Sequence, residues 1–153
     1  MMEARMTHPV YLVPASLKAL TAYSLAAMGL GVPDETLELV HLRASQINGC
    51  SVCVQLHGNA LKKAGESDER LFAVAAWRDA PYFSDAERAA LALSESVTRV
   101  ADRGDPVSDE LWAEAARHFD EQGLSALLIA ITSVNVWNRL NAATRQVAGA
   151  WSP

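Results

Sequence analysis

The chain has 153 residues, of which half are hydrophobic and a fifth are charged, and its formal net charge is −5. This length predicts a single domain over residues 1–153, because one hydrophobic core typically serves about 100–200 residues. The acidic balance argues against nucleic-acid binding, which requires clustered Lys and Arg to neutralise phosphates. The sequence also shows neither an apolar run near the ~20 residues that cross a bilayer nor the pattern of a signal peptide. We therefore expect a cytoplasmic protein without nucleic-acid or membrane partners.

Helix punctuation runs through the whole sequence, whereas alternating β-branched runs typical of strands are absent. In chain order, the expected helices cover roughly residues 14–28, 34–48, 50–63, 67–80, 84–100, 108–119 and 124–148. Asp34 and Ser108 are expected as N-caps, and Ser84 with Glu87 has the form of a capping box. The stretch 101–107, which contains Gly104 and Pro106, is the clearest loop. The pattern predicts an all-α bundle of about six to seven helices.

The last expected helix is apolar around most of its circumference, from Leu124 to Trp137. A helix of this kind is buried on all sides or lies in a subunit contact. Because a chain this small has few helices to surround it, we expect a homo-oligomer. The alternative is the central helix of a monomeric bundle.

The two cysteines, Cys50 and Cys53, form one C-x-x-C, which in a reducing compartment indicates redox chemistry or half of a metal site. Cys50, Cys53 and His57 are spaced by three and then four residues, so they share one helix face. The helix start favours a thiolate at Cys50, and the imidazole favours one at Cys53. A helix N-terminus and a neighbouring imidazole each lower the pKa of a thiol from its usual ~8.5.

The preceding expected helix brings Glu38 into consideration. The short turn at Asn48-Gly49 folds this helix back beside the thiol helix, where a carboxylate facing His57 would raise the basicity of the imidazole and fix its tautomer. The other three histidines, at positions 8, 41 and 118, are interpreted as structural or surface residues.

Glu38, Cys50, Cys53 and His57 together form the spacing E-x11-C-x2-C-x3-H. This pattern resembles the signature of the AhpD-like alkylhydroperoxidases, within the carboxymuconolactone decarboxylase superfamily. The similarity extends over roughly residues 10–145 and includes the segments 42–50 (LRASQINGC), 64–66 (AGE), 76–78 (AWR), 87–91 (ERAAL) and 135–140 (NVWNRL). One departure is that these proteins often carry a further His between the cysteines, where this chain has Ser51-Val52.

The resemblance implies an AhpD-like helical bundle that associates as trimers or hexamers, and a peroxidase that needs no haem, flavin or metal. It implies that Cys53 is peroxidatic, that Cys50 resolves the sulfenic acid into a disulfide, and that His57 with Glu38 relays protons. An external dithiol, such as a lipoyl group on a carrier protein, would be the reductant. The helix-start argument would instead make Cys50 the more acidic thiol. We favour Cys53, because its imidazole is a closer partner than the helix dipole.

Three alternatives remain open from the residues. The same two sulfurs would serve a general thiol–disulfide oxidoreductase. Cys50, Cys53, His57 and Glu38 could instead hold zinc in a non-catalytic structural module. Decarboxylation follows only from superfamily kinship, and the paired thiols speak against it. The four tryptophans (77, 112, 137 and 151) are expected to pack cores and interfaces, while Val52, Val54 and Leu56 could form an apolar mouth beside the thiols.

Overall fold

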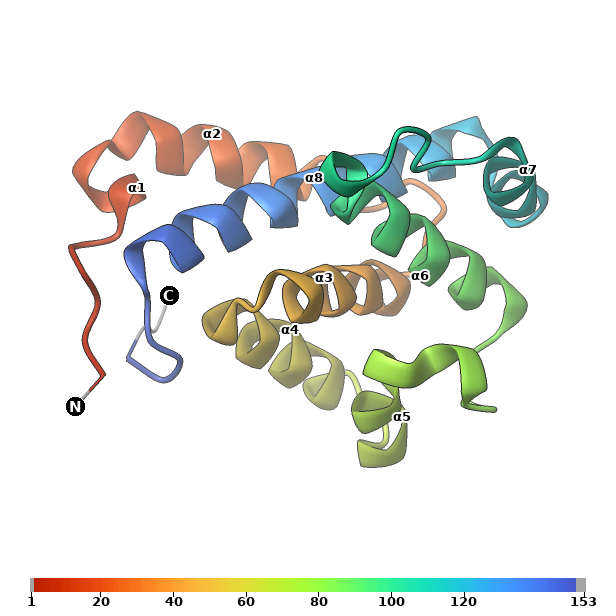
Figure 1. Cartoon of the computed structure of the whole chain (residues 1–153), viewed down its shortest axis with the longest axis horizontal. Helices are drawn as coiled ribbons and strands as arrows, with labels where there is room; N and C mark the ends of the chain where they lie inside the picture. The colour runs from red at the N-terminus through yellow and green to blue at the C-terminus, as the bar shows by residue number, and fades with distance from the viewer. Residues whose placement is uncertain (1, 151–153) are drawn as a thin grey trace.

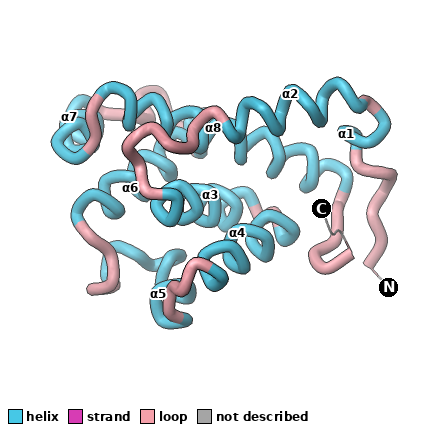
Figure 2. Tube along the Cα trace, turned by 180° about the vertical axis from the view of Figure 1, so that it is seen from behind, coloured by secondary structure: helices cyan, strands magenta, loops and turns pink. Residues whose placement is uncertain are grey.

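The computed structural model describes residues 2–150, and the regular structure of this part of the chain is entirely helical (Figures 1 and 2). The helices are α1 (Pro9–Leu12), α2 (Pro14–Leu25), α3 (Asp34–Asn48), α4 (Ser51–Lys63), α5 (Asp68–Ala73), η1 (Val74–Asp79), α6 (Asp85–Thr98), η2 (Val100–Asp102), α7 (Asp109–His118) and α8 (Glu121–Thr144), where η marks a 3₁₀-helix. The predicted all-α class is confirmed. Among the described helices, none is long and apolar enough to cross a bilayer.

Local signals fixed most helix ends. The Ser84–Glu87 capping box is present at α6, and the Ser108 hydroxyl accepts a hydrogen bond from the amide of Leu111 at the start of α7. The prediction of Asp34 as an N-cap was wrong, because Pro33 occupies that position in an extended conformation. Asp34 is instead the first helical residue, where its negative charge still favours the helix N-terminus.

Several helices differ from their predicted extents. The helix predicted over residues 14–28 ends at Leu25, and the short α1 before it was not predicted. The 3₁₀-helix η2 extends into the start of the stretch 101–107 that was predicted as a loop. The segment 67–80 is split, because Ala76 has non-helical angles inside η1 (φ −124°, ψ 34°). The last helix begins at Glu121 rather than Leu124, since the Asp120 carboxylate accepts from the amide of Gly123 and so caps the helix three residues earlier. It ends at Thr144 rather than near 148, because Arg145 adopts the left-handed conformation (φ 52°).

α3 and α8 lie at the centre of the arrangement, and α4, α6, α2 and α7 surround them (Figure 1). Leu127, Ala130 and Ile131 of α8 are fully buried in one cluster with Val40 of α3 and Leu93 of α6. The apolar surface of α8 is therefore largely covered within one chain, as the monomeric-bundle alternative predicted. Self-association stays a prediction, because the apolar surface of α8 does not by itself require a second subunit.

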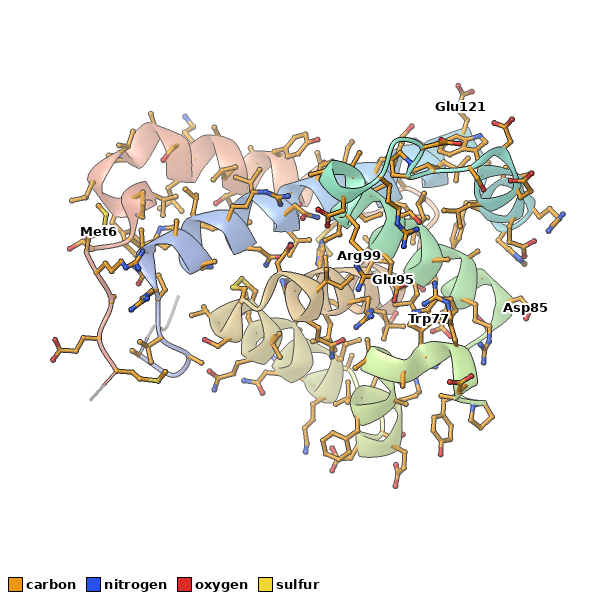
Figure 3. The ribbon with its side chains drawn as sticks, viewed as in Figure 1. Met6, Trp77, Asp85, Glu95, Arg99 and Glu121 are labelled. Carbon is orange, nitrogen blue, oxygen red and sulfur yellow. A yellow bond between two sulfur atoms is a disulfide. The ribbon has the colours of Figure 1, made fainter. Side chains whose placement is uncertain are left out.

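The buried carboxylate of Glu95 on α6 connects three helices, α3, α6 and η1. Glu95 of α6 is 4% exposed and accepts hydrogen bonds from Arg43 Nε (2.7 Å), Trp77 Nε1 (3.0 Å) and Arg78 Nη1 (2.6 Å), with Arg99 Nη1 at 3.6 Å. Trp77, Glu95 and Arg99 lie close together in Figure 3. Burial would raise the pKa of Glu95, but these donors outweigh it and lower the pKa. The charge of Glu95 is therefore fully compensated within the protein.

Candidate active site

The thiol pair sits where α3 passes into α4. Gly49 ends α3 in the left-handed conformation (φ 68°), which a glycine adopts without steric cost. The next residue, Cys50, is the N-cap of α4, and its Sγ accepts from the amide of Cys53 at 3.2 Å. Cys50 and Cys53 are joined by a disulfide, with Cα atoms 5.4 Å apart. Two thiols held this way can form a disulfide without any movement of the helices.

A ladder of asparagines fixes the last turn of α3 against α8. The amide group of Asn48 donates to Asn135 Oδ1 and to Asn138 Oδ1, both at 2.9 Å. Asn138 is fully buried and donates in turn to Ser45 Oγ at 3.0 Å. Buried polar groups without partners are costly, so this ladder specifies one register between the two helices. The position of the thiol turn is thereby tied to α8.

Asn141 is a residue of the site that sequence reasoning did not identify. Asn141, one turn beyond Asn138 on α8, donates from Nδ2 to Cys53 Sγ at 3.2 Å. Both residues are buried, with Cys53 3% and Asn141 7% exposed. A donor aimed at sulfur favours a thiolate over a thiol. The signal that could have found it is the spacing of three between Asn135, Asn138 and Asn141 in a helix that is otherwise apolar.

Glu38 and His57 meet, as the fold-back of α3 and α4 predicted. His57 Nδ1 and Glu38 Oε2 are 2.7 Å apart, and both side chains are mostly buried. Burial lowers the pKa of His57, and the hydrogen bond to Glu38 offsets this only in part. Burial would raise the pKa of Glu38, but its interactions with His41 and His57 lower the pKa to about 2. At neutral pH the pair is therefore a carboxylate and a neutral imidazole, which can accept a proton at Nε2.

His41 also belongs to this group, although the sequence placed it with the structural histidines. Its ring centroid lies 4.7 Å from that of His57, and its Nδ1 is 3.8 Å from Glu38 Oε1. Both ring nitrogens are buried, and neither has a hydrogen-bond partner among the described residues. One ligand atom each from Glu38, His41 and His57 lies within 4.8 Å of the others, so these three residues could hold a metal ion.

A cavity of about 280 Å³ opens onto these groups. Its polar wall contains Glu38, His41, Cys53, His57 and Asn141. Its apolar wall is formed by Leu25, Met28, Leu37, Val52, Leu56, Val134 and Trp137. Cavities of this composition suit small, largely apolar molecules with one polar reacting group.

The other residues predicted to lie near the thiols are only partly found there. Val52 and Leu56 line the cavity. Val54 packs instead against a second core cluster, which is formed by Leu39, Leu42, Leu61, Val74, Trp77, Phe83 and Leu91. Trp77 packs in that cluster, as expected, and Trp137 lines the cavity. Trp151 lies outside the described residues.

Two of the histidines are structural or lie at the surface. His8 is buried and caps α1 through the amide of Val10. His118 pairs with Glu114 on α7, at an Nε2–Oε1 distance of 3.1 Å.

Comparisons with known proteins show the family of this chain. The family model named Carboxymuconolactone decarboxylase family matches residues 14–96, which span α2 to α6 and include all four motif residues. The chain belongs to this family. Its relatives include YdfG of Bacillus subtilis (strain 168), 37% identical over 108 residues, with 71% of this chain and 72% of YdfG covered. YnjA of Escherichia coli (strain K12) is 36% identical over 105 residues, which cover 69% of this chain and 56% of YnjA.

Solved structures place this carboxymuconolactone decarboxylase family member among AhpD-like folds. An Agrobacterium tumefaciens protein of unknown function, proposed by name to be the antioxidant defence protein AhpD, aligns with a TM-score of 0.89 and 28% identity over 97% of this chain and 100% of that one. The debrominase Bmp8 aligns with a TM-score of 0.80 and 20% identity, covering 92% of this chain and 75% of Bmp8. At that identity, the likeness to Bmp8 shows the fold alone.

Proposed function

We propose that this protein is a thiol-dependent peroxidase that reduces organic hydroperoxides or H2O2 through a Cys50–Cys53 dithiol/disulfide cycle. The observation that carries the proposal is that Cys53 and the hydrogen-bonded Glu38–His57 pair line the same cavity. His57 follows Cys53 by one helical turn, and its Nε2 is available as a base because Nδ1 is engaged by Glu38.

The proposed cycle uses the two thiols, His57 with Glu38, and one external dithiol as the reductant. His57 takes the Cys53 proton, and the thiolate attacks the terminal oxygen of ROOH. The O–O bond breaks, Cys53 becomes a sulfenic acid, and RO⁻ leaves as ROH after it takes the proton from His57. The Cys50 thiol then attacks the Cys53 sulfur, which forms the disulfide and releases water. An external dithiol restores both thiols and is itself oxidised to a disulfide.

Burial of the sulfurs favours a small substrate over a protein disulfide. Cys50 and Cys53 are 2% and 3% exposed, and Cys53 lines the cavity. A peroxide can enter a cavity of about 280 Å³, whereas the disulfide of a folded protein cannot reach these sulfurs without movement of α4. This burial argues against the thiol–disulfide oxidoreductase alternative. It equally favours a slender reductant, such as a lipoyl group on a carrier protein.

Self-association is part of the proposal. Leu25 at the end of α2, Met28 in the turn after it and Leu56 of α4 are 59%, 47% and 41% exposed, and all three line the cavity. An apolar rim of this kind is typical of a surface that another subunit covers. We therefore expect a homo-oligomer, a trimer or a hexamer, in which a second copy narrows the cavity mouth. Light scattering coupled to size-exclusion chromatography measures the subunit number directly.

The decisive experiment is peroxide consumption driven by dihydrolipoamide. The wild-type protein should consume cumene hydroperoxide or H2O2, and both Cys50→Ser and Cys53→Ser should lose turnover. After one addition of peroxide, Cys50→Ser should carry a dimedone-reactive sulfenic acid on Cys53, and Cys53→Ser should carry none. Unchanged turnover in Cys53→Ser would overturn the proposal. Reduction of insulin disulfides without peroxide consumption would favour the general oxidoreductase.

A further inference from the structure

The group Glu38–His41–His57 has a feature that the peroxidase cycle does not use. Proton transfer needs one imidazole and one carboxylate, yet His41 adds a second imidazole whose two nitrogens are buried without hydrogen-bond partners among the described residues. Buried imidazole nitrogens are normally satisfied, so an exception calls for a specific explanation such as a bound ion. One of these nitrogens, His41 Nδ1, lies 3.8 Å from a carboxylate oxygen of Glu38.

We propose that Glu38, His41 and His57 bind one divalent transition-metal ion of the zinc type. Two imidazoles and one carboxylate form a donor set that zinc binds in proteins, with a water molecule as the fourth ligand. A tetrahedral zinc shell has ligand atoms roughly 3.3 Å apart, given metal–ligand distances of ~2.0–2.1 Å. One ligand atom from each of the three residues lies within 4.8 Å of the others, so the widest pair has to approach by at most about 1.5 Å to reach that spacing. Side-chain adjustments on two packed helices therefore suffice.

This ligand set differs from the structural zinc module considered from the sequence, which used the two cysteines. In the present structure both sulfurs are engaged in the disulfide, and the three ligand residues lie on the central helix α3 and on α4. They border a cavity, so the ion can enter and leave. The geometry therefore suits a reversible site rather than an ion that holds the fold together.

The bound ion would stop proton transfer, an effect that rests on the proposed peroxidase function. If the metal binds Nδ1 of His57, the ring hydrogen moves to Nε2, and Nε2 can no longer accept the Cys53 proton. If the metal binds Nε2, the accepting lone pair is used directly. In either case His57 stays neutral and ceases to be a base. Zinc would thus reversibly inhibit the cycle.

The test separates metal binding from catalysis by using oxidised protein, in which the disulfide removes thiol ligands. Isothermal titration of Zn²⁺ into this form should give one equivalent. His41→Gln should weaken the affinity at least about tenfold, because even residues that only orient ligands change metal affinity by 10–100-fold. The matched control is His118→Gln, which breaks the other His–Glu pair and should leave the affinity unchanged. Anomalous scattering at the zinc edge from soaked crystals should place the ion between the two rings, including in a Cys50→Ser/Cys53→Ser variant.

Several outcomes would overturn the site. These are no saturable binding to correctly folded oxidised protein, equal affinities for wild type and His41→Gln, or an anomalous peak at His118. Inhibition is tested separately in the reduced enzyme, where Zn²⁺ should reduce wild-type peroxidase turnover by a larger factor than that of His41→Gln. Equal factors would show that zinc acts through the thiols. If the wild type lacked peroxidase activity, the proposed function would fail while binding to oxidised protein still tested the site.

Discussion

Two glutamates, one on α6 and one on α3, have different kinds of partner in this molecule. Glu95 of α6 is 4% exposed, and its neighbours are Arg43, Trp77, Arg78 and Arg99. The guanidinium groups and the indole N–H compensate its negative charge. Glu38 of α3 has a side chain that is 30% exposed, and its neighbours are His41 and His57. Guanidinium groups keep their protons at all relevant pH values, whereas imidazoles exchange theirs near neutrality.

The partners of a carboxylate, rather than burial alone, separate a structural carboxylate from one that can transfer protons. Glu95 and its four partners form the Glu95 cluster, which joins α3, η1 and α6. None of these five residues lines the cavity. Glu38, His41 and His57 line the cavity, and so does Cys53. We therefore expect substitutions at Glu95 to change the free energy of unfolding and substitutions at Glu38 to change the rate.

The largest expected effect is on catalysis. Glu38→Gln should reduce the peroxidase rate on the order of 100-fold or more, because positioned acid–base groups contribute about 10²–10⁴-fold. The amide still hydrogen-bonds His57 but cannot stabilise the imidazolium that forms when Cys53 loses its proton. The unfolding free energy should change by only about 1 kcal/mol. Steady-state turnover with dihydrolipoamide and a thermal melt measure the two quantities.

Glu35→Gln, at an exposed position of the same helix, is the control and should retain wild-type turnover. Full activity in a folded Glu38→Gln protein would contradict the assigned role.

The next largest effect is on stability. Glu95→Gln should reduce the unfolding free energy by about 3 kcal/mol, because it leaves Arg43 and Arg78 beside a neutral group. For a protein of this size, that loss lowers the Tm on the order of 10 °C. Glu114→Gln is the matched control, since its partners His118 and Arg117 lie at the surface, where ion pairs contribute about 0–1 kcal/mol. Equal melting curves for the two variants would show that the Glu95 cluster is not the structural element inferred here.

A third, smaller effect concerns the thiol itself. Asn141→Ala removes the hydrogen bond to Cys53 Sγ and should raise the pKa of the Cys53 thiol. Because hydrogen bonds to charged groups are worth about 1.5–3 kcal/mol, peroxidase turnover at neutral pH should fall about tenfold. The pH dependence of iodoacetamide alkylation in a Cys50→Ser background measures the pKa. Asn59→Ala, an exposed position on α4, should alter neither quantity. An unshifted alkylation profile in Asn141→Ala would exclude Asn141 as a thiolate donor.

Much of the fold could be predicted because it is encoded locally. The Ser84–Glu87 capping box, the Ser108 cap and Gly49 act within a few residues, and the all-α class follows from many such signals. The errors arose where two local signals compete. Gly123 was read as lying outside the last helix, but Asp120 caps that helix from three residues earlier. Arg145 ends it in a left-handed conformation that no local sequence signal marks.

The site was predictable to the extent that helical spacing determines it. Cys53 and His57 share a face of one helix, and Glu38 reaches His57 because a short turn joins α3 to α4. Asn141 was not predictable, since its contact with Cys53 spans 88 residues and depends on the register of α8 against α3. His41 was set aside because a single histidine on an amphipathic helix carries no signal until its neighbours are known. The motif thus identified the reactive residues, and packing identified those that modulate them.

The smallest expected effect is on the pH dependence of stability, which reports on His57 and Glu38. The pKa of His57 is lowered in the folded state, so below its unfolded value of 6.5 the unfolded chain binds more protons and stability falls as the pH falls. The pKa of Glu38, lowered from 4.5 to about 2, adds a loss over that more acidic range. Thermal melts in EDTA from pH 7.5 to pH 5 (roughly the range in which only histidine titrates) should therefore show a declining Tm, with a shallower decline in His57→Gln. His118→Gln should keep the wild-type slope, because His118 lies at the surface. Identical slopes in all three proteins would mean that His57 is not held neutral by burial, and the base assigned to the cycle would lose its electrostatic support.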